Sequence, residues 1–289
     1  MFATVVKAGV RHRSVAAVIA AVIAGSAGAV ALGLSAPAAA GQEAQQDEGL
    51  SLQRFVVGNM LFLTYHEAAH VLIEDLEVPI TGWPEDSADN LATLMMEPDA
   101  NDSDSTVLAA SAALGWLQDA RTAEAAGRRP NFADVHALSE ARAQRIVCLL
   151  AGGEIASNSE RKFFGELAKS RGGTDAYLKQ CASQSKLIVS GWAKSLGEHF
   201  LGQDDEPSAE IEFRYEAAPA ALEQARSYME SNSVLEVVAG DIRELVHDVN
   251  PFTLVARSCK SPDAFWSSQK REAVICYELA DWFIKNPPA

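Results

Sequence analysis

The stretch from Tyr65 to His70 holds the residues whose types and spacing could do chemistry, because it reads Tyr-His-Glu-Ala-Ala-His. Two histidines four residues apart on a helix lie about 40° apart on one face, so they can bind one metal ion. Zinc takes imidazole nitrogens, and a catalytic zinc site keeps one position open for water. Glu67 stands where it could accept a proton from that water. The pattern therefore predicts one zinc ion per chain, with His66 and His70 as ligands and Glu67 as the general base.

The alternative for this stretch is a pair of ordinary histidines on a helix. The surrounding run from Phe55 to Ile73 is almost wholly apolar, so we expect both histidines and Glu67 to enter the protein interior. Unpaired polar groups in the interior cost on the order of several kcal/mol, and a bound metal would compensate all three. The burial therefore favours the metal site.

A third ligand must come from outside this helix. Glu74 shares a face with His70, but the eight helical steps from His66 to Glu74 span about 12 Å, which is too far for one ion. The next predicted helix carries Glu85 and Asp89 four residues apart on one face. We expect Glu85 to bind the metal and Asp89 to accept a hydrogen bond from a ligand imidazole. The alternative is that both carboxylates lie in solvent at the start of the helix.

Helical patterns dominate the chain around this site. Breaks at Gly, Pro and polar residues separate predicted helices at 52–76, 84–97, 106–126, 137–151, 159–170 and 174–199. After Gly202 the pattern changes, and we expect strands at 211–215, 252–256 and 273–277 and helices at 218–230 and 233–247. The predicted fold class is therefore mainly α (α+β), a helical domain with a small late antiparallel sheet, and residues 51–289 form a single domain.

The first forty residues have the pattern of a signal peptide. Basic residues precede an apolar run from Val15 to Leu34, and small residues follow up to Ala40. We predict a signal peptide at 1–40, a flexible lead-in at 41–50, and export to the periplasm or the extracellular space. The alternative is that the apolar run stays in place as a membrane anchor. Beyond this segment we expect no membrane contact.

Charge and cysteine content narrow the function further. The 289-residue chain has a formal net charge of −15, which repels phosphate backbones and argues against nucleic-acid binding. Export would place the four cysteines in an oxidising compartment, where two disulfides are favoured. Sequence alone does not choose among the connectivities that four cysteines allow. A metal site built from all four is the alternative, but their spacing includes no Cys-x-x-Cys pair.

The order of these motifs resembles a known group of enzymes. His-Glu-x-x-His followed by Glu-x-x-x-Asp is similar to the arrangement of the gluzincin metallopeptidases, zincin-like proteins that bind zinc through two histidines and one glutamate. More closely, the chain resembles a bacterial family of exported metallopeptidases with no assigned substrate. The motifs that carry this resemblance are Pro79, Gly82, Glu85, Asp86, Ala88 and Asp89, then His136-Ala-Leu138, Glu140, Arg142, Cys148-Leu-Leu150, Cys181 and Trp192, and finally Cys259, Ala264-Phe265 and Cys276-Tyr277-Glu278-Leu279.

The resemblance implies a zinc-dependent peptidase that hydrolyses the bonds of a peptide or protein substrate. A non-catalytic zinc-binding exported protein is the alternative. His136 and Tyr277 are candidates for donating a hydrogen bond to a tetrahedral oxyanion, although each could equally be structural. Among the cysteine connectivities we favour Cys148–Cys181, which would tie two helices, and Cys259–Cys276, which would close a predicted hairpin.

The chain departs from the gluzincin pattern in the order of its elements. Gluzincins usually place a sheet before the active helix, and an edge strand of that sheet holds extended substrate. Here the predicted strands follow the helix, so a substrate-binding edge would have to come from 209–217, 252–258 or 272–277. Gly172-Gly173-Thr174 also replaces an expected Leu-Pro turn, which bears only on local structure.

Overall fold

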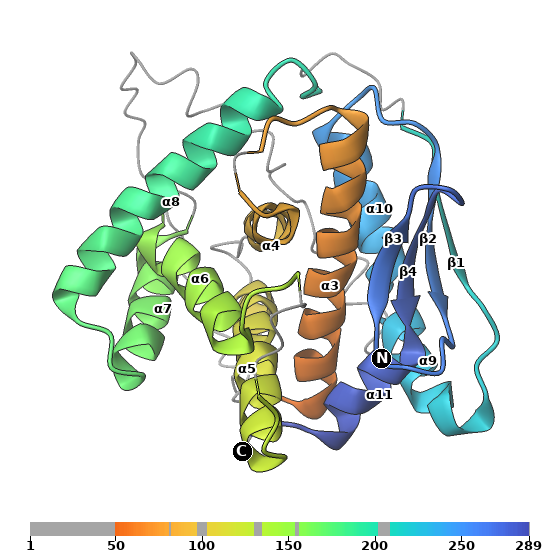
Figure 1. Ribbon diagram of the computed structural model, residues 1–289, viewed down its shortest axis with the longest axis horizontal. Helices are drawn as coiled ribbons and strands as arrows, with labels where there is room; N and C mark the ends of the chain where they lie inside the picture. Colours follow the sequence, from red (N-terminus) through yellow and green to blue (C-terminus); the bar gives the residue numbers. More distant parts are fainter. Residues whose placement is uncertain are drawn as a thin grey trace, which may run out of the picture.

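The structure is a computed structural model that describes residues 50–80, 82–96, 103–129, 135–153, 156–201 and 209–288. The predicted signal peptide lies outside these residues, and so does the lead-in except for its last residue. The helices are α3 (Leu52–Asp75), α4 (Pro84–Met95), α5 (Ser103–Ala125), α6 (Ser139–Gly152), α7 (Asn158–Ser170), α8 (Asp175–Ser195), the short 3₁₀ helix η2 (Ala220–Leu222), α9 (Glu223–Ser231), α10 (Val234–Leu245) and α11 (Tyr277–Lys285). The strands are β1 (Ile211–Tyr215), β2 (Phe252–Arg257), β3 (Ala264–Ser267) and β4 (Glu272–Cys276). We call α3 to α8 the helical half and β1 to α11 the sheet half (Figure 1).

Helix α3 is buried along most of its length. It begins after Ser51, whose side chain accepts a hydrogen bond from the Arg54 amide. Apolar residues lie on all of its faces, as expected for a helix surrounded by protein. Helices α4 and α5 pack against it, and so do β3, β4, α10 and α11, so that it stands between the other helices of its half and the sheet (Figure 1). Gly58 permits the close approach of α5, because a Cβ there would lie 2.4 Å from the Leu108 carbonyl oxygen.

Helix α4 brings carboxylates to the side of α3. It starts at Pro84, whose fixed φ suits the first position of a helix. Glu85 and Asp86 follow in the first turn, where the positive end of the helix dipole favours negative charge. The helix packs against both α3 and α6. Farther along the helical half, Cys148 of α6 and Cys181 of α8 form a disulfide, which is the pairing that we favoured.

The sheet has four strands in the order β1-β2-β4-β3. Strand β2 runs parallel to both β1 and β4, and only β3 and β4 are antiparallel. The prediction of a mainly helical fold with a small late sheet is confirmed, but the sheet is mixed rather than antiparallel. The reason lies in the connections along the chain. Helices α9 and α10 connect β1 to β2, and the connection from β2 to β4 contains β3. Such long connections allow a crossover between parallel strands, which a tight turn does not.

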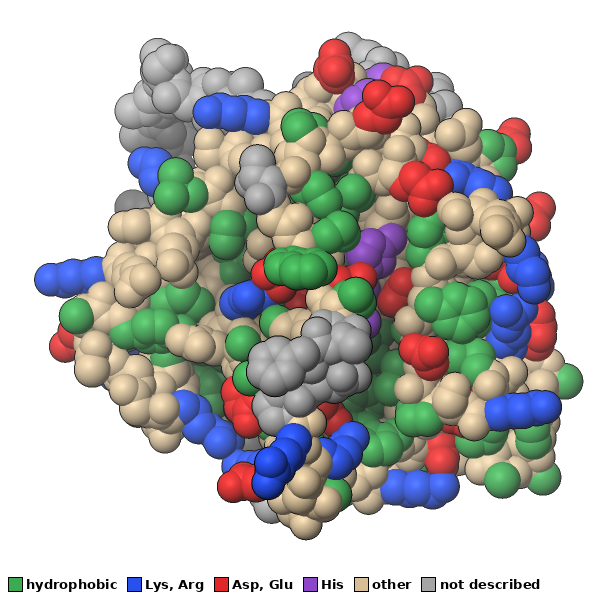
Figure 2. All heavy atoms as spheres, in the orientation of Figure 1, with side chains coloured by type: hydrophobic (Ala, Val, Ile, Leu, Met, Phe, Trp, Pro, Cys, Tyr) green, Lys and Arg blue, Asp and Glu red, His purple; other side chains and the backbone are tan. Residues whose placement is uncertain are grey.

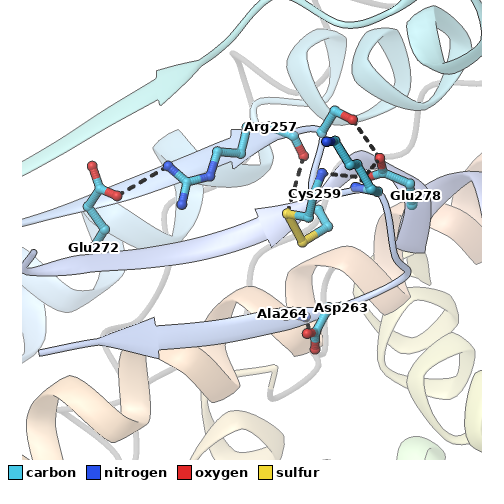
Figure 3. The surroundings of a disulfide bond; sticks show 9 residues. Arg257, Cys259, Asp263, Ala264, Glu272 and Glu278 are labelled. Atoms are coloured by element: carbon cyan, nitrogen blue, oxygen red, sulfur yellow. Dashed lines mark hydrogen bonds and ion pairs between the residues drawn. A yellow bond between two sulfur atoms is a disulfide. The ribbon is translucent and has the colours of Figure 1, made fainter.

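Two elements of the sheet half were absent from the sequence prediction. Strand β3 was not expected, and Tyr277 begins helix α11 instead of ending a strand. The disulfide Cys259–Cys276 has the favoured pairing, but it does not close a hairpin. It joins the segment after β2 to the last residue of the parallel strand β4 (Figure 3).

Two general properties bear on where the protein works. None of the helices in the described ranges has the length and apolar character that a membrane span requires. The two disulfides suggest an oxidising, exported environment, because cytosolic thiols are kept reduced.

Candidate metal centre

The two histidines of α3 and the first turn of α4 meet at one point. His66 Nε2 lies 3.2 Å from His70 Nε2 and 3.0 Å from Glu85 Oε2. The third pair, His70 Nε2 and Glu85 Oε2, is 3.3 Å apart. Ligand atoms bonded at about 2.05 Å in a tetrahedral shell lie about 3.3 Å from one another. The separations fit this value, so His66, His70 and Glu85 could hold a metal ion between them.

The opposite side of the His66 ring is held by Asp89. His66 Nδ1 lies 2.8 Å from Asp89 Oδ1, and both residues are buried. In the neutral imidazole with the proton on Nδ1, the Nδ1–H group donates a hydrogen bond to this carboxylate and the lone pair of Nε2 faces His70 and Glu85. The structure therefore places the two carboxylates of α4 on different nitrogens of the same imidazole.

Arg142 of α6 was not expected among the residues around the site. Its Nε and Nη2 donate to Asp89 Oδ2 and Oδ1 at 2.7 and 2.5 Å, and its guanidinium carbon lies 3.6 Å from the centre of the Trp116 ring. The sequence held one signal for it. Arg142 shares a helical face with Ile146 and Leu149, which are buried, and a charged residue on a buried face needs a partner.

Opposing effects act on the pKa values of the buried pair. Burial lowers the pKa of His66, but its hydrogen bonds with Asp89 and Glu85 outweigh this and raise it to about 9. Burial raises the pKa of Asp89, but hydrogen bonds from His66 and Arg142 outweigh it and hold the value at about 2. Asp89 is therefore a carboxylate at neutral pH.

Glu85 and Glu67 differ in what surrounds them. Burial tends to raise the pKa of Glu85, but hydrogen bonds from three histidines hold it well below its usual range. Glu67 is almost completely buried, and desolvation raises its pKa even though His66 and His70 lower it. A raised pKa lies nearer to neutral pH, which is a favourable property in a general base.

The structure brings His136 to this cluster and does not bring Tyr277 there. His136 Nε2 lies 3.0 Å from Glu85 Oε2, and its ring centre is 6.2 Å from that of His66. The hydroxyl of Tyr277 donates to the main-chain carbonyl of Glu216 at 2.7 Å. Burial raises the pKa of Tyr277 to about 12, and the charged neighbours that modify this value are Arg226, Glu230 and Glu216, none of which belongs to the cluster.

The cluster is open to solvent on one side. His66 is buried, whereas the side chains of His70 and Glu85 are each 18% exposed and that of His136 is 43% exposed. Figure 2 shows a histidine side chain in a hollow near the middle of the face drawn, with acidic and hydrophobic side chains around it. Glu74, at the exposed end of the same helix, accepts a hydrogen bond from Trp266 Nε1 at 2.7 Å instead of joining the cluster.

Comparison with known proteins gives one match. A protein family described as "Putative metallopeptidase" matches residues 34–196, which is more than half of the 289 residues. The matched range includes every residue of the histidine cluster and ends before the sheet. No curated protein and no solved structure matches the chain.

Proposed function

The chain belongs to this metallopeptidase family, and on that premise we propose that it is a zinc-dependent peptidase whose centre is formed by His66, His70 and Glu85. One observation supports this most strongly. Three ligand atoms converge beside a buried glutamate whose pKa is raised, in a family named for metal-dependent peptide hydrolysis. Two imidazoles and one carboxylate are also a known ligand set of catalytic zinc.

The metal contributes Lewis acidity, since bound zinc lowers the pKa of a water molecule and polarises a carbonyl group. The chain supplies the remaining functions. Glu67 accepts the proton of the attacking water and passes it to the amine that leaves. Asp89 holds the His66 ring in the orientation and tautomer that ligation requires. His136, whose Nε2 lies 3.0 Å from Glu85 Oε2, would donate a hydrogen bond to the oxyanion.

The substrate is a peptide or protein outside the cytoplasm. This follows from the hydrolysis that we propose, from the two disulfides and from the signal pattern of residues 1–40. Mature protein that begins near Gly41 and has no free thiols, measured by intact mass and alkylation, is the expected result.

A zinc-binding protein without turnover is the second candidate, and one observation favours it. His136 Nε2 is as close to Glu85 Oε2 as His66 Nε2 is; its ligand atom does not converge with those of His66, His70 and Glu85, but a shift of its ring toward them would supply a fourth protein ligand and close the site. Structural zinc sites have four protein ligands, whereas catalytic sites leave a position open. A structural site, however, has no need of a buried acid such as Glu67.

The deciding experiment replaces Glu67 by glutamine. Glu67→Gln keeps the volume and a polar end but accepts no proton, so the protein should keep its zinc and lose cleavage by several orders of magnitude. Wild type and variant, each loaded with one zinc, are incubated with a broad peptide library, and cleavage is measured by mass spectrometry. Glu74→Gln, on the same helix but bonded to Trp266, is the matched control and should cleave like wild type.

The other outcomes oppose the peptidase. Equal cleavage by wild type and Glu67→Gln would trace the activity to something other than Glu67. Loss of zinc from Glu67→Gln would make Glu67 a structural partner of the site. Zinc binding by wild type with no cleavage of any library member would favour the non-catalytic protein.

A further inference from the structure

Helices α4 and α6 are joined by two arginine–aspartate ion pairs that differ in their surroundings. Arg142 pairs with Asp89, and their side chains are only 5% and 3% exposed. Arg145 pairs with Asp86, and those side chains are 40% and 32% exposed. The pairs can be compared directly, because they join the same two helices, use the same residue types and are three residues apart in each helix. Only the buried pair touches the metal centre.

The buried arginine holds both oxygens of its partner. Arg142 Nε donates to Asp89 Oδ2 and Arg142 Nη2 to Asp89 Oδ1, so the plane of the carboxylate is fixed by two parallel hydrogen bonds. His66 Nδ1 approaches the same Oδ1 at 2.8 Å, and Arg142 Nη2 is 3.5 Å from that nitrogen. One orientation of Asp89 therefore satisfies both partners.

The guanidinium of Arg142 also packs against an aromatic ring. Its carbon lies 3.6 Å from the centre of the Trp116 ring on α5, which is the distance of a cation–π contact. Four side chains thus follow one another to the candidate metal centre: the partly buried Trp116 and then the buried Arg142, Asp89 and His66. A buried ion pair adds little stability over an apolar pair of equal volume, because both charges lose their hydration. The position of the pair needs another explanation.

We propose that Arg142 is a positioning residue that decides which carboxylate of α4 becomes the metal ligand. Asp89, with both oxygens bonded to Arg142, is held on the Nδ1 side of His66 and cannot turn toward the ion. Glu85 is left as the carboxylate ligand, and His66 is fixed with Nε2 facing His70. The inference rests on the metal site of the proposed function but not on peptide cleavage.

The test compares Arg142→Lys with the control Arg145→Lys. Lysine keeps the charge but offers no planar pair of donors, so Arg142→Lys should free Asp89 to rotate without leaving it unpaired. We expect the zinc affinity of Arg142→Lys, measured by competition with a chromophoric chelator, to fall about 10–100-fold. The affinity of Arg145→Lys should stay within about threefold of wild type, because its partner Asp86 does not touch the histidines.

A second measurement separates positioning from a general loss of structure. Cobalt bound in place of zinc absorbs visible light according to its ligands and geometry. Its spectrum in Arg142→Lys should differ from that in wild type and in Arg145→Lys, while circular dichroism shows all three folded. If Arg142→Lys does not fold, Arg142→Gln takes its place in the same comparison. Glutamine is neutral and keeps two N–H donors on its amide nitrogen.

Two results would overturn the inference, and they differ from the failure of the proposed function. Wild-type affinity and an unchanged cobalt spectrum in the folded Arg142 variant would show that Arg142 does not position the ligands. An equal loss in Arg145→Lys would show a general effect of joining α4 to α6. Absence of peptide cleavage, with the Arg142 effect present, would overturn only the peptidase.

Discussion

The helical half and the sheet half bury different kinds of residue. All of the residues classed as buried and polar in the described ranges lie in the helical half: Asn59, Thr64, His66, Glu67, Asp89, Thr93, Ser111, Arg142, Glu160 and Ser185. Several bond locally, since Thr64, Thr93 and Ser111 each donate to the carbonyl four residues earlier. His66, Glu67, Asp89 and Arg142 form another group, and they lie at the candidate metal centre. Of the other buried polar residues, Asn59 and Glu160 hydrogen-bond to the main chain and the Ser185 hydroxyl has no hydrogen-bond partner among the described residues, so the gathering of buried charged groups is what marks the candidate site.

The sheet half covers part of α3 and contributes none of its described residues to the cluster. Phe283 of α11 packs edge-on against Phe55, with ring centres 5.7 Å apart. Near the other end of α3, Arg271 donates to both oxygens of Asp75 at 2.7 and 2.6 Å. The comparison teaches that one half holds the candidate metal ligands while the other helps to bury α3. Substitutions should separate metal binding from stability along this division.

The largest effect is expected at Glu85. Glu85→Ala removes a ligand and should abolish tight zinc binding, whereas Asp89→Asn removes only the partner of a ligand and should weaken binding about 10–100-fold. Both affinities are measured by zinc titration against a chelator, with the metal-free proteins checked for folding. Loss of zinc from Asp89→Asn together with its retention in Glu85→Ala would reverse the two roles and contradict the ligand set.

A large loss of stability without loss of metal affinity is expected in the sheet half. Leu254 of β2 is fully buried, so Leu254→Ala should lower the free energy of unfolding by about 2–5 kcal/mol. Denaturant unfolding of the metal-free protein measures this, and zinc titration below the unfolding transition should give the wild-type affinity. Leu150 of α6 is equally buried, so Leu150→Ala gives the same pair of measurements for the helical half. A fall in zinc affinity for Leu254→Ala comparable to that of Asp89→Asn would show that the two halves are not separable.

Much of the helical half could be predicted because its signals are local. Helix α3 starts at Leu52 because Ser51 caps it, and α4 starts at Pro84 because proline suits the first position of a helix. The approach of His66 to His70 follows from a spacing of four residues on one helix. These features depend on neighbours in the sequence and need no knowledge of the fold.

What escaped prediction depends on contacts between distant segments. Strand β3 is only four residues long, and it is extended because it pairs with β4, not because of a pattern in its own residues. The parallel pairing of β2 with β4 depends on where the chain goes between them. Arg142 could be recognised as a buried charge, but its partner Asp89 lies 53 residues away, which no local pattern reports. The mixed sheet and the support of His66 are therefore results of the fold.

The smallest effect concerns a carboxylate of the sheet half, and it tests whether polar groups there serve structure alone. Glu278 of α11 accepts hydrogen bonds from the Ser258 hydroxyl and from the amides of Cys259 and Lys260, next to the disulfide Cys259–Cys276 (Figure 3). Burial tends to raise the pKa of Glu278, but these hydrogen bonds outweigh it and lower the pKa below its ordinary value of 4.5. A lowered pKa in the folded state stabilises the protein above the ordinary value, and the stabilisation is lost as the pH falls through the lowered one.

Glu278→Gln should therefore reduce the free energy of unfolding by about 1–2 kcal/mol at pH 7, and the difference from wild type should shrink steadily below about pH 4. Denaturant unfolding at a series of pH values, with the disulfides intact, measures this difference. Glu212→Gln, an exposed position on β1, is the control and should match wild type throughout. Zinc affinity at pH 7 should be unchanged, because Glu278 contacts the segment after β2 and not the histidine cluster. A stability difference that persists at low pH would mean that shape, and not charge, accounts for the effect of Glu278.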